Sequence, residues 1–425
     1  MKKLFILFIA ICLLGCQEEI QKITDQKDYD IFLNTSITPT ISENLKQLEF
    51  WQAKFKNDST HLIEMGQLAA IHTSLFESTG DISELLISEK LLKKTVEIAA
   101  RNKDTYLRAL AHNYISQHRF KEAKTLLDSA YVFPDNKFET EYMLFDVAME
   151  LGDYEMADRL LGKIKDVKNF NYLIRLANWS DHNGNLNAAI KYMEQAKQIA
   201  ESRNDKDLKV WVYSNIGDYY GHAGRISDAY NYYLKTLKLE PDNAYAKKQL
   251  AWIAYSFEKN TDEALRIIDS ITVNHKIPDY NLFKAELAVY NGNPSEAKKQ
   301  NENFVTAIAN EKYGEMYNTY LIKLYAETEP QKALDLAKIE LTNRATPETY
   351  QLLAYAQLKA GNKEAALKTI ENFVVGKTSE PKALYHCAMI YKANEMTDRV
   401  IALKPELIEA AFELGPVTIE SIKNL

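Results

Sequence analysis

The sequence predicts an all-α fold in which antiparallel helix pairs stack into an α-solenoid. Three observations support this prediction. A small residue recurs every 32 to 40 residues, prolines concentrate between the repeating units, and apolar residues recur at spacings of three and four, as on one helix face. The sequence has no alternating apolar and polar run bounded by hairpin turns, so no β-sheet is expected.

The recurring small residue is an alanine in eight consecutive units. It falls at Ala123, Ala157, Ala189, Ala229, Ala264, Ala297, Ala333 and Ala366. A turn glycine precedes it by five residues in five of these units, at Gly152, Gly184, Gly224, Gly292 and Gly361. In the other three units the turn residue is His118, Lys259 or Thr328. The period lies near 34 residues, which is typical of repeats built from two helices.

A small residue lets the second helix of a pair lie close against the first. We therefore expect Gly217 of one helix to face Ala229 of the next. Phe145, Trp252 and Leu321 are large residues at the position of Gly217, so their pairs should be more open or differently tilted. Pro241, Pro278, Pro347 and other prolines fall between units, where they end helices without interrupting one.

The clearest unit, Leu208 to Asn243, resembles a tetratricopeptide repeat. Its Ile216-Gly217 pair is followed at the family spacing by Tyr220, Gly224, Ala229, Tyr233 and Pro241. The resemblance covers residues 105–395 and implies a right-handed superhelix whose first helices line a concave face. It leaves residues 41–104 as a divergent N-terminal helical unit or cap, and residues 396–425 as a C-terminal helical cap.

The N-terminus predicts export and lipid attachment. Lys2 and Lys3 precede an apolar run from Leu4 to Leu14, which is too short to span a bilayer and fits a signal peptide over residues 1–15. Leu13-Leu14-Gly15-Cys16 resembles a lipobox, which implies that Cys16 carries the lipid and that residues 16–40 form a lipidated tether. Gln17-Glu18-Glu19 resembles an acidic export signal. We expect an outer-membrane lipoprotein, either surface-exposed or periplasm-facing.

The net charge and the cysteine content exclude several kinds of partner and binding site. The formal net charge is -7, so phosphate backbones are repelled and nucleic acid is not expected as a partner. Membrane attachment must then come from the acyl chains. Cys387 is the one cysteine that is neither in the signal peptide nor lipidated, so an intrachain disulfide and paired-cysteine metal sites are excluded. Its apolar helical surroundings predict a buried structural thiol.

The sequence contains none of the motifs that carry common catalytic chemistry. There is no glycine-rich phosphate loop after a strand, no His-Glu-x-x-His pair and no Gly-x-Ser-x-Gly elbow. We therefore predict that the protein is not an enzyme and has no catalytic, cofactor or metal residues.

A polar ladder is expected on the concave face. By the family alignment, groove positions hold His112, Asp146, Asn178 and Asp218 in successive first helices, and, one turn later, Glu150, Asp181, His182 and His222. One interpretation is that these residues merely solvate an open groove. The sharper hypothesis is a partner-binding strip for a basic or polar segment, with a divalent metal as a further alternative.

These observations favour a lipid-anchored tetratricopeptide scaffold of the bacterial cell envelope. Such a scaffold would mediate protein–protein interactions in an envelope complex and hold a protein or peptide partner in its concave groove. The alternative is an outer-membrane lipoprotein that binds a glycan or a small nutrient.

Overall fold

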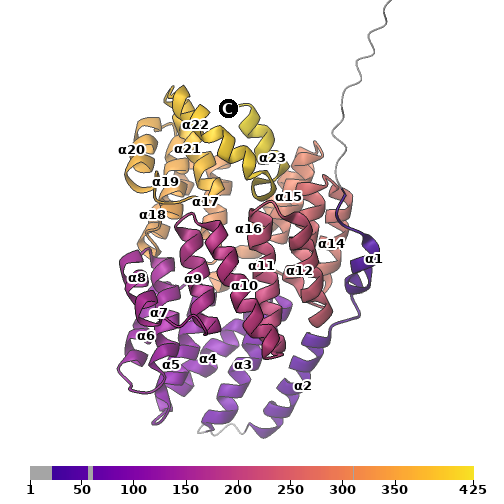
Figure 1. The fold of residues 1–425 in the computed structure, drawn as a ribbon, viewed down its shortest axis with the longest axis vertical. Coiled ribbons are helices and arrows are strands. Elements are labelled where there is room, and N and C mark those ends of the chain that lie inside the picture. Colours follow the sequence, from indigo (N-terminus) through magenta and orange to yellow (C-terminus); the bar gives the residue numbers. More distant parts are fainter. Residues whose placement is uncertain (1–21, 56–60, 310) are drawn as a thin grey trace, which may run out of the picture.

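The computed structural model describes residues 22–55, 61–309 and 311–425. These residues contain 23 α-helices and no β-strand, arranged as successive packed pairs (Figure 1). The predicted all-α solenoid is confirmed. The signal peptide, Cys16 and the acidic residues that follow it lie outside the described residues, so lipid attachment stays a prediction. None of the described helices has the length and apolar character that a membrane crossing requires.

The chain begins with α1 (Gln26–Tyr29), a short 3-10 turn η1 (Asp30–Leu33), α2 (Pro39–Lys54), α3 (Leu62–Thr79) and α4 (Ile82–Ile98). The first helices of the repeating pairs are α5 (Lys103–Ser116), α7 (Lys137–Leu151), α9 (Phe170–His182), α11 (Lys206–His222), α13 (Ala244–Trp252), α15 (Tyr280–Tyr290), α17 (Asn318–Thr328), α19 (Pro347–Lys359) and α21 (Pro381–Ala393). The second helices are α6 (Phe120–Tyr131), α8 (Tyr154–Lys163), α10 (Leu186–Ser202), α12 (Ile226–Leu239), α14 (Thr261–Asn274), α16 (Pro294–Ile308), α18 (Pro330–Asn343), α20 (Lys363–Phe373) and α22 (Thr397–Glu409). A turn η3 (Glu311–Tyr313) precedes α17, and α23 (Ala411–Lys423) ends the chain.

The recurring alanines form the seam between paired helices. All eight are buried, and seven of them have no exposed surface. At Gly217 the close neighbour differs from the expected Ala229, because a Cβ on Gly217 would lie 2.6 Å from the ring atom Cε1 of Tyr233. Glycine is therefore required there by an aromatic ring one turn further along α12.

The turns between paired helices share a left-handed backbone conformation. The five turn glycines have φ between 67° and 83°, which glycine adopts without a steric penalty. His118 and Lys259 occupy the same turn where glycine is missing, and both have φ of 58°. Two of the three substituted turns thus keep the geometry of the glycine turns, whereas at the third, next to Thr328, Glu329 has φ of -139°.

The first helix of the pair that contains Trp252 is irregular. After α13 the helix continues as a π-helical turn, η2 (Ile253–Phe257). Trp252 packs against the C-terminal helix, since its Nε1 donates a hydrogen bond of 3.0 Å to the backbone oxygen of Phe412 in α23. Ser256 donates a second hydrogen bond of 2.6 Å to the same oxygen.

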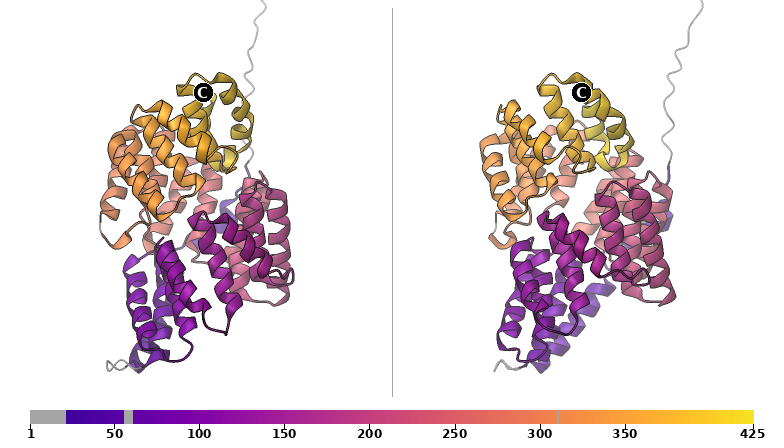
Figure 2. Two further views of the ribbon diagram at one scale, coloured as in Figure 1. Left: turned by 90° about the vertical axis from the view of Figure 1, so that its left-hand side faces the viewer. Right: turned by 60° about the vertical axis from the view of Figure 1, so that its left-hand side comes forward.

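The superhelix coils back so that distant units meet. The C-terminal units α17–α22 lie next to α5–α9 (Figures 1 and 2). The side chain of Asn343 donates a hydrogen bond of 3.1 Å to the backbone oxygen of His118, and Arg344 forms an ion pair of 2.7 Å with Glu150. Further along, the backbone N–H of Lys276 donates a hydrogen bond of 2.7 Å to the oxygen of Thr79. The superhelix therefore has contacts between units that are far apart in the sequence. In a simple open solenoid each repeat contacts only its neighbours.

The described part of the expected tether differs from a free chain. Residues 22–33, which we call the strap, pack along α12 and α14, and Tyr29 has no exposed surface. The reason is that Ile23, Tyr29, Phe32 and Leu33 bring apolar side chains to the largest core cluster. Polar composition alone suggested a loose segment, but these four residues are enough to dock it.

Candidate partner-binding site

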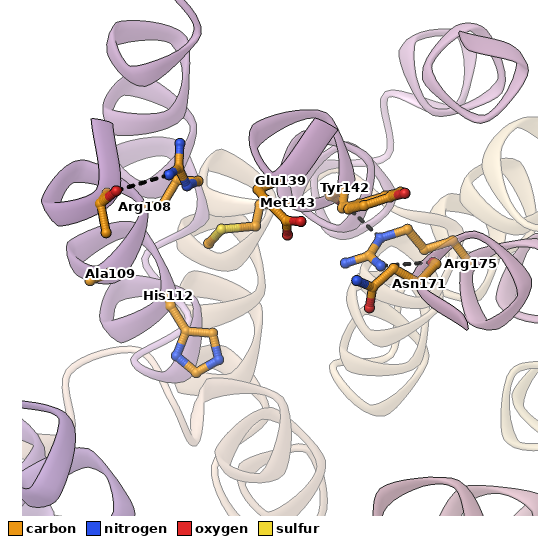
Figure 3. Close-up of a pocket in the computed structure, with 9 residues that line it drawn as sticks. Arg108, Ala109, His112, Glu139, Tyr142, Met143, Asn171 and Arg175 are labelled. Carbon is orange, nitrogen blue, oxygen red and sulfur yellow. Dashed lines mark hydrogen bonds between the residues drawn. The ribbon is translucent and has the colours of Figure 1, made fainter. Parts of the chain in front are cut away.

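The concave face is built by the first helices of successive pairs. Its N-terminal part contains a hollow of about 330 Å³ between α5, α7 and α9 (Figure 3). His112 lines this hollow from α5, Tyr142 from α7 and Arg175 from α9, as Figure 3 shows. The structure thus places His112 in this hollow, and its role in partner binding stays a prediction.

Arg175 makes three polar contacts in this part of the groove. Its Nε donates a hydrogen bond of 2.9 Å to the backbone oxygen of Tyr142, and its Nη1 donates one of 2.9 Å to that of Asn171. Its Nη2 forms an ion pair of 2.5 Å with Asp146. Burial raises the pKa of Asp146, while the Arg175 charge lowers it. Burial lowers the pKa of His112, and the Asp146 charge opposes this shift. Asp146 therefore already has a cationic partner within the chain.

Asp218 likewise has internal partners. Its carboxylate accepts hydrogen bonds from the hydroxyls of Tyr233 and Tyr245, at 2.7 and 2.6 Å, and from the side-chain amide of Gln249 at 2.8 Å. Three donors on one carboxylate indicate a structural network between neighbouring units. A role of Asp218 in partner binding stays a prediction.

A hollow of about 740 Å³ forms a cleft where the C-terminal units approach the middle of the superhelix. On one side it is bounded by Asp181, His182 and His222 at the ends of α9 and α11. On the other side it is bounded by five glutamates from α19, the start of α21, α22 and α23. We call the carboxylates of this hollow the acidic cleft: Asp181, Glu348, Glu380, Glu406, Glu409 and Glu413.

A second hollow of about 290 Å³ continues the cleft toward α7. It shares Asp181, His182, Glu348 and Glu380 with the larger hollow and adds Glu150 and Asn178. Of the eight predicted groove residues, the structure therefore brings five together here, namely Glu150, Asn178, Asp181, His182 and His222. His112, Asp146 and Asp218 lie apart from them.

The acidic cleft holds charge that the described chain does not neutralise. Within the described residues, Asp181, Glu348 and Glu380 form no ion pair, and Glu413 has only a contact of 3.9 Å with His222. Glu380 is exposed at the rim of the cleft, and nearby protein removes part of its hydration. Partial burial, followed by the Glu413 and Glu348 charges, raises the pKa of Glu380 to about 7. Burial also raises the pKa values of Asp181 and Glu413, and the nearby histidines oppose both shifts. A positively charged ligand would relieve this repulsion.

Cysteine chemistry and metal binding can be assessed for the described residues. Cys387 is buried, as predicted, and burial raises the pKa of its thiol to about 12, so the reactive thiolate form is disfavoured. In the part of the chain that the structure describes, no group of three or more His, Cys, Asp or Glu side chains is arranged to hold a metal ion.

The sequence analysis missed the five glutamates of the cleft. They belong to the last third of the chain, and they reach the groove only because the superhelix coils back on itself. One signal was available: Glu348 follows Pro347 and Glu380 precedes Pro381, so both mark the start of a first helix. The closing of the superhelix, which brings these positions opposite Asp181, is not encoded in any local pattern.

The comparisons with known proteins agree with this architecture. Residues 170–242 match the tetratricopeptide repeat family. This segment is therefore similar to tetratricopeptide repeats. The match covers α9 to α12, including the unit whose spacing resembles the family in the sequence.

Solved structures similar to the chain are remote. A Pseudomonas aeruginosa structure from the functional characterization of pilF is 16% identical, with a TM-score of 0.37, and the alignment covers 50% of this chain and 96% of that one. Human IFIT1, solved as a dimer with PPP-AAAA, is 14% identical with a TM-score of 0.43, and 83% and 95% of the two chains are covered. A signal transduction ATPase with a tetratricopeptide repeat sensor from Pyrococcus horikoshii is 16% identical with a TM-score of 0.37, covering 83% of this chain and 53% of that one. The comparison with curated proteins gave no match.

Proposed function

We propose that the protein is a lipid-anchored scaffold of the bacterial cell envelope that holds a basic segment of a partner protein in the acidic cleft. Tetratricopeptide repeats generally mediate protein–protein interactions. In this protein a cleft of about 740 Å³ offers room for a partner segment. The observation that carries the proposal is the gathering of carboxylates there, of which Asp181, Glu348 and Glu380 form no ion pair within the described residues. Complementary charge would speed the approach of a basic partner and favour it over acidic ones.

The alternative function, binding of a small nutrient or a glycan, agrees less well with the lining of this cleft. Its volume of about 740 Å³ is sufficient for a small molecule. Small-molecule sites, however, are lined predominantly by apolar and aromatic side chains. The walls of this cleft are mainly carboxylates, histidines and small polar residues. A basic peptide fits that lining better than a neutral ligand.

The charge requirement can be measured with a fluorescent oligo-lysine peptide and the full chain. Asp181→Asn combined with Glu380→Gln keeps the shape of the cleft and removes two charges. We expect the affinity to fall several-fold to about tenfold at low salt, because each partly exposed charge pair contributes up to about 1 kcal/mol. The dependence of affinity on salt should also become weaker. Fluorescence anisotropy at increasing salt measures both effects.

The matched control removes two exposed charges from second helices on the outside of the solenoid, by Asp262→Asn and Glu364→Gln. This control should bind like the wild type. In the wild type, affinity should rise as the pH rises through about 7, because the raised pKa means that Glu380 gains its charge in that range. Equal affinity of the cleft variant and the control variant would reject the acidic cleft as the binding site.

A further inference from the structure

The strap is attached to the fold by its backbone as well as its side chains. The carboxylate of Glu258 accepts hydrogen bonds from the backbone N–H groups of Ile23 and Thr24, at 2.7 and 2.6 Å, and from the Thr24 hydroxyl at 2.9 Å. Glu258 is itself buried. Charge-assisted hydrogen bonds of this kind are among the stronger ones in proteins. They hold the first described residues of the chain at one defined place.

Side-chain contacts continue along the strap. The fully buried Tyr29 donates a hydrogen bond of 2.7 Å to Glu263, and Gln26 donates another of 2.7 Å to the same carboxylate. Asp30 forms an ion pair of 2.6 Å with Arg266. Residues 22–33 therefore belong to the folded domain.

The position of this attachment relates the N-terminus to the acidic cleft. Glu258 lies in the turn between η2 and α14, which joins the two helices of its pair. The corresponding turns of the two preceding pairs contain Gly184–Asn185 and Ala223–Gly224, and these turns form a wall of the cleft. Stacked repeats place equivalent turns along one edge of the solenoid. The strap thus leaves the fold on the edge where the cleft opens.

A contact between the strap and α12, which follows the Gly224 turn, supports this placement. The hydroxyl of Tyr230 accepts a hydrogen bond of 3.1 Å from the backbone N–H of Asp25 and donates one of 3.0 Å to the side chain of Asp28. Tyr230 lies near the start of α12, a few residues after the Gly224 turn. The strap therefore spans the edge from the pair next to the cleft to the following pair.

We propose that the strap holds the mouth of the acidic cleft against the membrane, so that the partner is the membrane-adjacent basic segment of a membrane protein. This inference rests on the lipid anchor of the proposed function. Six residue steps separate Cys16 from Lys22, and a fully extended chain of that length spans at most about 22 Å. An anchor at Cys16 then keeps this edge of the solenoid close to the lipid surface.

The charge of the cleft argues for a protein partner over the lipid itself. Anionic headgroups would be repelled by the carboxylates of the cleft. A basic protein segment would be attracted by the same carboxylates. A cleft that faces the membrane therefore selects basic segments of proteins that lie at the membrane surface.

The orientation can be tested with probes at the two ends of α10. Asn187→Cys lies at the cleft rim, and Arg203→Cys lies just beyond the other end of the helix. A helix of 17 residues separates the two sites by about 25 Å. Cys387 is buried, so a fluorophore will label the introduced cysteine. The lipidated full chain is bound to vesicles of phosphatidylethanolamine and phosphatidylglycerol that contain a lipid with a headgroup quencher.

We expect strong quenching at position 187 and little at position 203. Glu258→Ala, which removes the acceptor of the strap, should make the two positions alike while the protein stays on the vesicles. A second variant inserts a flexible linker of about ten Gly and Ser residues after Gln21, which leaves the strap docked and should lower quenching at position 187. Equal quenching at both positions of the wild type, or quenching that neither variant changes, would overturn the orientation. A wild-type chain that does not sediment with the vesicles would instead overturn the anchor, and with it this inference.

Discussion

Replacing Ala229 by glutamate is expected to lower the free energy of unfolding by about 3–5 kcal/mol, because the new carboxylate would be buried without a partner. Ala229 has no exposed surface and lies in the largest core cluster, between α11 and α12. The same cluster includes Tyr29 of the strap. Protection against hydrogen exchange should therefore fall first across residues 206–239 and then in the strap, and urea denaturation gives the overall loss.

Ser227→Glu is the matched control, since it adds the same side chain to an exposed position two residues earlier in α12. It should change stability little, because an acidic residue in the first turn of a helix is favourable. If Ala229→Glu left hydrogen exchange across residues 206–239 as in the wild type, the packing of α11 against α12 described above would be incorrect.

Replacing Cys16 by serine is expected to move the protein from the membrane fraction to the soluble fraction. Each buried CH₂ of an acyl chain contributes about 0.8 kcal/mol, so losing the lipid removes the attachment that we propose. The fractionation of cells that express the full chain measures this directly. Metabolic labelling with a fatty-acid analogue should mark the wild type and leave the variant unmarked.

Cys12→Ala provides the comparison, because Cys12 lies in the apolar run of the expected signal peptide, four residues before Cys16. This variant should keep both the label and the membrane attachment. A wild-type chain that takes up no fatty-acid label would contradict the lipoprotein prediction, and the proposed membrane orientation would fall with it.

Local packing rules made much of the fold predictable from the sequence. The buried alanines, the left-handed turns and the proline-bounded helices each depend on residues within one repeat of about 34 positions. These features could be located because their causes lie close together in the sequence.

The candidate site depends on arrangements that no single repeat determines. The small rotation between successive pairs accumulates along the solenoid, and it decides whether Glu380 meets Asp181 across the groove. Asp181, His182 and His222, which the alignment assigned to the groove, line one hollow, but the alignment could not reveal that Arg175 forms an ion pair with Asp146. The strap was missed for a related reason, since Glu258, which binds Thr24, is 234 residues away from it.

Site-specific photocrosslinking in intact cells tests most directly whether the acidic cleft holds the partner. A photoreactive amino acid at Asn187 lies at the rim of the cleft, and the same group at Glu364 lies on the exposed outer side of α20. We predict an adduct from position 187 that maps to a basic segment of one protein, and that disappears when Asp181→Asn and Glu380→Gln are introduced. Adducts that form equally from position 364, or that persist in the charge variant, would contradict the assignment of the cleft as the binding site.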